Sequence, residues 1–143
     1  MNPKVLFQGN LKEEDIVVHF FEEGQRKISP ELEPQIESIW QETLASAKEK
    51  GQEAYDGLSY RMDSIEIQDG KLHIWVSPTS FKVVNGLKKL KERVWELGED
   101  FMSRCIAEAS LVRTSDGKCI FGVKTGKTLS TSTKDLLGGI VED

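Results

Sequence analysis

The side chains best suited to chemistry are few and lie far apart along the 143 residues of this chain. His19 lies in an apolar run, His73 lies opposite Glu66 in a predicted hairpin, and no serine or cysteine nucleophile motif is near either histidine. Packing and a cross-strand pair are therefore the ordinary interpretations. Cys105 and Cys119 lack the paired spacing of a zinc site, so both are expected to be reduced thiols.

A cluster of cations offers a second kind of chemistry, the binding of phosphate. Lys88, Lys89, Lys91 and Arg93 fall on a predicted helix. A solvated helix face is the commoner role of such a cluster. The net charge of −5 gives no reason to prefer phosphate binding.

The three tryptophans fall into two groups. Trp40 and Trp95 fit the apolar stripes of predicted helices and are expected in the core. Trp75 falls on the polar side of a predicted hairpin, where its ring could stack on a base or sugar or pack beneath a helix. Both interpretations of Trp75 stay open.

The elements that must hold these side chains begin with two β-rich runs, 5–7 and 16–21. The second run is so uniformly apolar that burial on both faces is expected. Ser29 and Pro30 then begin a helix, whose apolar stripe continues to Ala47.

A hairpin over 60–77 is predicted by its turn and by its apolar register. Asp69-Gly70 is a favoured two-residue turn. It places Ile67 opposite Leu72, which makes one side of the ribbon apolar and the other polar.

The second half of the chain is predicted to hold a helix over 85–97 and another hairpin. This hairpin turns at Asp116-Gly117, and its register places Cys119 opposite Thr114.

In the same register Cys105 opposes residue 128, so the two cysteines are not neighbours and no disulfide is expected. A polar loop over 126–133 precedes a last short strand over 135–141. These elements predict an α+β fold of N-terminal strands, two amphipathic helices and hairpins, with its best boundary near 98–100.

Composition excludes several classes of protein. Apolar residues make up 38% of the chain and charged residues 30%, as in ordinary globular proteins. The acidic balance disfavours a nucleic-acid partner. No apolar run approaches the roughly 20 residues that span a bilayer. The N-terminus lacks a secretory signal peptide, so a cytoplasmic location without a membrane partner is expected.

The end of the chain carries a Gly138-Gly139 step, two apolar residues and Glu142. Taken alone, such a step is an ordinary turn or bulge at a strand end. Its context resembles the opening of the Nudix signature, the motif of diphosphate hydrolases. Residues 104–142 give a strand, a turn, a strand with a basic residue, a polar loop and a strand ending in Gly-Gly-x-x-Glu, in the Nudix order.

Two positions depart from the Nudix pattern. Leu137 stands where many members carry proline, and Lys124 stands where arginine is common.

The upstream residues resemble the N-terminal region of the Nudix hydrolases that cleave UDP-glucose and UDP-galactose. The resemblance implies that Arg61, Phe81, Lys82 and Lys124 surround a UDP-sugar, with cations on the phosphates and an aromatic face on the ring. Surface strand ends are the alternative for Arg61 and Lys82. The matching segments are Trp40 on a helix, Tyr55-Asp56-Gly57, Tyr60-Arg61, the hairpin and Thr79-Ser80-Phe81-Lys82.

The resemblance divides the chain into an N-terminal α+β region that binds substrate, 1–100, and the first strands of a Nudix-type mixed sheet, 101–143. In the family, a glutamate-rich helix binds Mg²⁺, which activates the attacking water. Only two metal contacts carry over, the backbone carbonyl of Gly138 and the carboxylate of Glu142, and no catalytic residue does. The catalytic helix is expected beyond Asp143.

The chain is therefore expected to be an N-terminal fragment, or a short relative, of a Nudix hydrolase acting on nucleoside diphosphate-linked substrates such as UDP-sugars. A non-enzymatic α+β binding or assembly module is the alternative. A Nudix sheet without its covering helix exposes apolar residues, so a homodimer through 104–142 is also expected.

The polypeptide 1–143 is expected to release no UMP from UDP-glucose, because it lacks the Mg²⁺-binding helix that stabilises the developing charge. Chromatographic assay of UMP with and without Mg²⁺ measures this. Mg²⁺-dependent release that persists unchanged in Glu142→Gln would contradict the expectation.

Overall fold

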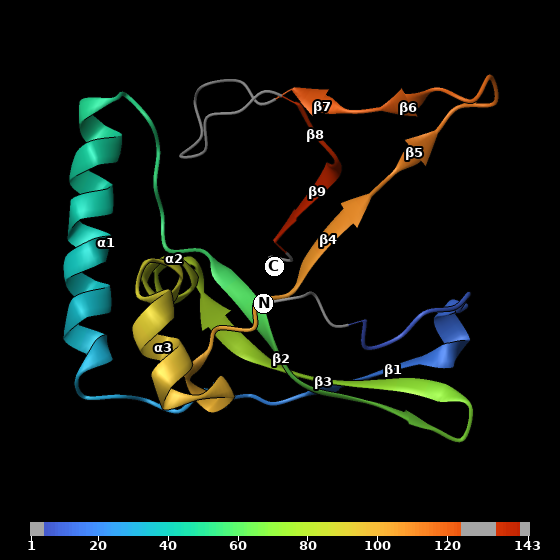
Figure 1. Ribbon diagram of the computed structural model, residues 1–143, viewed down its shortest axis with the longest axis horizontal. Helices are drawn as coiled ribbons and strands as arrows, with labels where there is room; N and C mark the ends of the chain where they lie inside the picture. The colour runs from blue at the N-terminus through green and yellow to red at the C-terminus, as the bar shows by residue number, and fades with distance from the viewer. Residues whose placement is uncertain (1–4, 124–133, 141–143) are drawn as a thin grey trace.

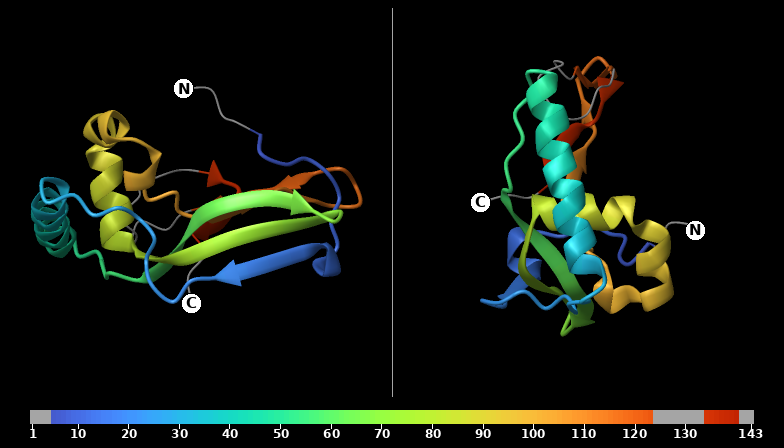
Figure 2. Two further views of the ribbon diagram at one scale, coloured as in Figure 1. Left: turned by 90° about the horizontal axis from the view of Figure 1, so that it is seen from below. Right: turned by 90° about the vertical axis from the view of Figure 1, so that its left-hand side faces the viewer.

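The computed structural model describes residues 5–123 and 134–140 and confirms the α+β class (Figure 1). Helices stand at one end of a long, twisted three-stranded sheet, and short two-stranded ladders form the C-terminal part (Figure 2). None of the helices in these ranges is long and apolar enough to cross a bilayer. The elements in chain order are η1 Glu13–Asp15, β1 Ile16–Phe20, α1 Leu32–Glu49, β2 Leu58–Gln68, β3 Lys71–Ser80, α2 Phe81–Lys89, α3 Lys91–Leu97, η2 Glu99–Phe101, β4 Ala107–Ser110, β5 Val112–Arg113, β6 Cys119–Ile120, β7 Gly122–Val123, β8 Lys134–Asp135 and β9 Leu137–Ile140.

The predicted hairpin is confirmed as β2 and β3, which pair antiparallel with Ile67 opposite Leu72 and Glu66 opposite His73. Both turn residues, Asp69 and Gly70, have positive φ angles of 51° and 75°, as a tight hairpin turn requires. The strands run further than predicted, and a bulge between Met62 and Ser64 interrupts the ladder.

Strand β1 lies at the edge of the sheet and pairs parallel with β3, in the order β1-β3-β2. The expected burial of 16–21 on both faces is wrong, because Val18 is 60% exposed and Phe20 56%. The helices gather at one end of the sheet rather than over β1, so one face of this apolar strand meets solvent (Figure 2).

Helix α1 begins two residues after the predicted start. The Ser29 hydroxyl accepts a hydrogen bond from the Leu32 backbone N–H at 3.4 Å, which satisfies one free donor of the first turn. The predicted apolar stripe is confirmed, since Leu32, Ile36, Trp40 and Ala47 are all buried.

The single helix predicted over 85–97 is wrong. The chain forms α2 and α3, which bend at Leu90. The bend brings Val94 of α3 into one core with Leu87 of α2 and with Leu32 and Ile36 of α1. Burying these side chains together accounts for a bend that no proline imposes.

The predicted strand over 5–7 is also wrong, because Val5 is 73% exposed and no strand is formed there. A short apolar run forms a strand only where a neighbouring edge accepts its hydrogen bonds.

The C-terminal hairpin exists as β5 and β6, but its register is shifted by one residue: Cys119 lies opposite Arg113, not Thr114. The loop is longer than two residues, because Thr114 donates its N–H to Lys118 and accepts one from Gly117. Gly117, whose φ angle is 83°, is the bulge glycine that closes this loop.

Beyond this hairpin the flanking strands separate. Strand β4 pairs with β9 and β7 pairs with β8, so the described part of the last predicted strand, 135–140, belongs to two short strands. Cys105 bridges Arg61 in β2, and its predicted neighbour 128 lies outside the described residues.

The packing of α1 on α2 gives a stability prediction. A Cβ atom at Gly86 would lie 2.8 Å from Cγ2 of Ile36. We expect Gly86→Val to lower the free energy of unfolding by about 2 kcal/mol, since overpacking a dense core costs roughly 1–3 kcal/mol. Urea unfolding followed by circular dichroism measures this. The control Lys89→Val places the same side chain at an exposed position of α2 and should cost no more than about 0.5 kcal/mol; equal losses would contradict the account.

Candidate functional site

Among the predicted site residues that the structure describes, Arg61 is the most deeply buried, at 4% exposure. Its Nε donates to the backbone carbonyl of Met102 at 3.1 Å, and its Nη1 forms an ion pair with Asp63, which sits at the bulge of β2. A buried guanidinium is stable only when paired in this way. Arg61 therefore has protein partners in place of a ligand.

The chain around Arg104 adds to β2 like a short extra strand. Met62 donates its N–H to the Arg104 carbonyl at 3.0 Å, and Ile106 donates to Tyr60 at 2.9 Å. These bonds and the Arg61 side chain hold Ser103 and Arg104 beside α3.

Phe81 and Lys82 open α2 and face α1 instead. Phe81 packs edge-on against Trp40, with ring centroids 6.1 Å apart. The Lys82 ammonium pairs with Glu37 at 3.2 Å and lies 4.0 Å from Asp56. Hydrogen bonds from Gln41 and then from Lys82 lower the pKa of Glu37, so Lys82 faces an ionised carboxylate at neutral pH.

The other predicted contacts cannot be assembled around Arg61 and Lys82. Lys124 and Glu142 lie outside the described residues. Gly138 lies within β9, opposite Ala109 of β4. A Cβ at Gly138 would come within 2.0 Å of the Glu108 carbonyl, so close strand approach explains this glycine and the ordinary turn interpretation is wrong.

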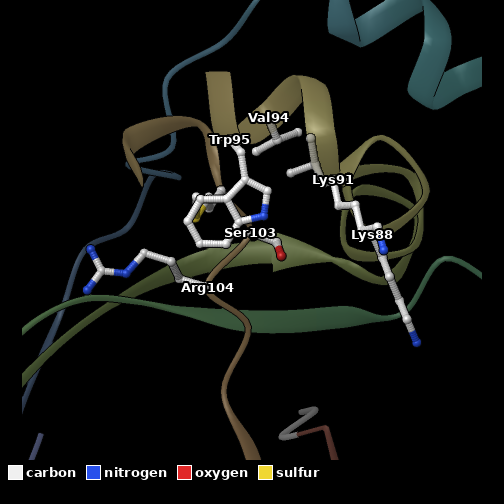
Figure 3. Close-up of a pocket in the computed structure, with 8 residues that line it drawn as sticks. Lys88, Lys91, Val94, Trp95, Ser103 and Arg104 are labelled. Atoms are coloured by element: carbon white, nitrogen blue, oxygen red, sulfur yellow. The ribbon is translucent and has the colours of Figure 1, made fainter. Parts of the chain in front are cut away.

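A hollow of about 220 Å³ lies between α2, α3 and the segment after η2. We call it the basic pocket. Lys88 and Lys91 extend on one side of the Trp95 ring and Arg104 on the other (Figure 3). The lining residues are Leu87, Lys88, Lys91, Val94, Trp95, Met102, Ser103 and Arg104.

The cations of the basic pocket are not neutralised locally. Within 5–123 and 134–140, neither lysine nor Arg104 forms an ion pair. The nearby carboxylate Asp100 pairs with Lys27 at 2.7 Å, and that lysine is the main cause of its lowered pKa, with smaller contributions from Arg61 and Arg104. The pocket is thus a positive patch on an acidic protein.

Arg104 has a φ angle of 40°, in the left-handed region that few residues other than glycine adopt. Such a conformation costs of the order of 1 kcal/mol and persists when neighbouring contacts impose it. Here the hydrogen bond from Met62 holds the Arg104 backbone against β2, and the Arg104 side chain extends from there on the side of the Trp95 ring opposite the two lysines (Figure 3).

The sequence does not predict this pocket as a site, although part of the signal is present in it. In the single helix that the sequence predicts, Lys88, Lys91 and Trp95 follow a spacing of three and four residues, which would place them on one side. The expectation that Trp95 lies in the core is wrong, because its side chain is 46% exposed. Arg104 joins only through its contact with β2, which no local pattern predicts.

The Trp75 ring lies on His19, with ring centroids 4.5 Å apart and ring planes 12° from parallel. His73 lies opposite Glu66 as predicted, but its hydrogen bond joins it to His19.

No protein-family model matches this chain. A search of curated proteins also finds no match. Function must therefore be argued from the residues of the site.

The buried ion pair gives a test of what Arg61 does. Arg61→Met leaves Asp63 buried without its cation and should cost about 3–5 kcal/mol of unfolding free energy, whereas Arg61→Met with Asp63→Leu should recover much of the loss. The partly exposed cation Lys82 is the control, and Lys82→Met should cost no more than about 1 kcal/mol. Thermal and urea unfolding measure all three; a double variant less stable than Arg61→Met would refute the structural role.

Proposed function

We propose that this chain binds nucleoside diphosphate-linked ligands such as UDP-sugars, and that the phosphate group binds in the basic pocket. The observation that carries the proposal is the set of three cations around the half-exposed ring of Trp95. The resemblance to Nudix hydrolases supplies the ligand class.

The chemistry of the pocket suits such a ligand in two ways. Ammonium and guanidinium groups form charge-assisted hydrogen bonds with phosphate oxygens, and a forked guanidinium can contact two at once. The indole of Trp95 offers a flat apolar face to a base or sugar. Electrostatic steering of an anion to the basic pocket requires positive charge near the pocket. It does not require that the net charge of the protein be positive.

The size of the pocket limits what it can enclose. Its volume of about 220 Å³ is smaller than the roughly 300–1,000 Å³ of most small-molecule sites. It can hold a diphosphate or one ring, while the rest of a UDP-sugar lies along the surface. We therefore expect modest affinity, dominated by charge and sensitive to salt.

The residues first assigned to the ligand take other roles in this proposal. Arg61 helps to position Arg104 at the edge of the basic pocket, because Arg61 lies in β2 and donates a hydrogen bond to the Met102 carbonyl. Lys82 would have to leave Glu37 and Asp56 to reach a phosphate.

The described residues give no carboxylate to the expected magnesium site. Mg²⁺ is held by one or two carboxylates together with substrate phosphates and water. Gly138 offers only a backbone carbonyl, and Glu142 lies outside the described residues. The described ranges also contain no group of three or more His, Cys, Asp or Glu side chains around a common point. We therefore propose binding rather than hydrolysis.

One observation favours the alternative of an assembly module. Ile16, Val18 and Phe20 form an exposed apolar row on β1, and exposed apolar patches often mark contact surfaces. An assembly module would show a mass that rises with concentration and no affinity for UDP-glucose.

Titration of UDP-glucose and UDP, followed by Trp fluorescence and calorimetry, tests the proposal. We expect Lys88→Ala with Lys91→Ala to weaken binding about tenfold, equivalent to about 1.4 kcal/mol. Lys89→Ala removes an adjacent exposed lysine that does not line the pocket and should leave Kd within about twofold.

Three outcomes would contradict this placement. Equal weakening by Lys89→Ala would mean that only overall charge matters. Weakening confined to Lys82→Ala would return the ligand to the site that the resemblance implied, and absence of any binding would favour the assembly module.

A further inference from the structure

A cluster of two histidines and a tryptophan lies on one face of the sheet and consists of His19, His73 and Trp75. None of the three residues lines the basic pocket. Nε2 of His19 and Nδ1 of His73 lie 2.9 Å apart in a hydrogen bond, and one nitrogen donates while the other accepts, according to tautomer. Trp75 stacks on His19 at 4.5 Å. All three side chains are half-buried.

The strand register creates this cluster. Parallel pairing places His19 opposite Trp75 and Val17 opposite His73. Side chains two residues apart in a strand share a face, so His73 and Trp75 point to the same side of β3. Across β2, the facing residues are Ser64 and the exposed carboxylate of Glu66.

We propose that His19 and His73 form a two-imidazole site for a divalent transition-metal ion of the copper or nickel class. Imidazole nitrogen is a good ligand for these ions. With metal–nitrogen bonds of about 2.0–2.1 Å, two nitrogens 2.9 Å apart subtend about 90° at the metal. That angle matches adjacent positions of a square-planar or tetragonal ion, whereas a tetrahedral ion would need a separation of about 3.3 Å.

Metal binding requires that one proton move within an imidazole ring and that the rings of His19 and His73 rotate. In the neutral pair, one of the two facing nitrogens carries a hydrogen. That hydrogen moves to the other nitrogen of the same ring, so both facing lone pairs become free for the metal. No proton is lost overall, and no electron is transferred.

The protein supplies two metal ligands, His19 and His73, and the ring of Trp75 lies beside them. Because the described ranges gather no third His, Cys, Asp or Glu, water fills the other positions. The Glu66 carboxylate accepts a hydrogen bond from Gln68 at 2.8 Å and does not join the pair. The Trp75 ring stacks on one face of His19.

Titration of Ni²⁺ and Cu²⁺ into the full chain tests the proposal, in a Cys105→Ser, Cys119→Ser background that removes thiol ligands. We expect one ion per chain, quenching of Trp75 fluorescence and, for Cu²⁺, an electron paramagnetic resonance spectrum with two equivalent nitrogens. His19→Gln or His73→Gln should weaken binding more than about tenfold, since even indirect partners of a ligand contribute tenfold.

Matched variants separate ligation from folding. Glu66→Gln changes a charge opposite His73 and should leave stoichiometry and nitrogen count unchanged. Val17→His adds an imidazole across from His73 and should tighten binding about tenfold or more. Circular dichroism checks that each variant is folded.

Unchanged affinity in His19→Gln and His73→Gln would overturn the proposal, as would the absence of binding in a folded chain. The outcome is independent of the basic pocket, because Lys88→Ala with Lys91→Ala should bind the metal like the parent.

Discussion

The buried guanidinium of Arg61 is the interaction on which the arrangement of the site depends. A charge at 4% exposure needs partners, and it finds them in Asp63 and in the Met102 carbonyl. The Met102 contact holds the chain after η2 against β2. Because this same stretch continues into Ser103 and Arg104, the ion pair also positions one wall of the basic pocket.

The molecule presents two chemically different surfaces. At the helical end, cations from α2, α3 and the added segment surround an indole ring. Along β1 and β3, imidazoles meet another indole, and the carboxylate residue Glu66 is paired opposite His73. The first surface favours anions and the second favours metal cations, so the two proposed ligand classes do not compete.

The sequence predicts correctly those elements whose structure is set by residues close together in the chain. The Asp69-Gly70 turn fixes its own register because only a two-residue loop of that chemistry matches the twist of both strands. At Thr114 the same reasoning failed, since the threonine joined the loop and a longer turn with a bulge glycine shifted the pairing by one residue. The bend at Leu90 could not be predicted either, because its cause is burial against α1 rather than a helix-breaking residue.

The candidate site was less predictable than the fold. The lysines and Trp95 were visible in the sequence, but their exposure depends on the bend, and Arg104 arrives through contacts with β2. The pairing of His19 with His73 likewise depends on β1 lying parallel to β3, a choice that no turn chemistry specifies.

The placement of β1 beside β3 also sets an order of assembly. The hairpin of β2 and β3 closes through a two-residue turn, so it can form within microseconds of local chain motion. In the sequence, all of α1 lies between strand β1 and its partner β3. Closing so long a loop costs conformational entropy before any hydrogen bond between the two strands can form. We expect β1 to dock last onto a finished hairpin, which makes the histidine pair one of the latest contacts that the folding chain completes.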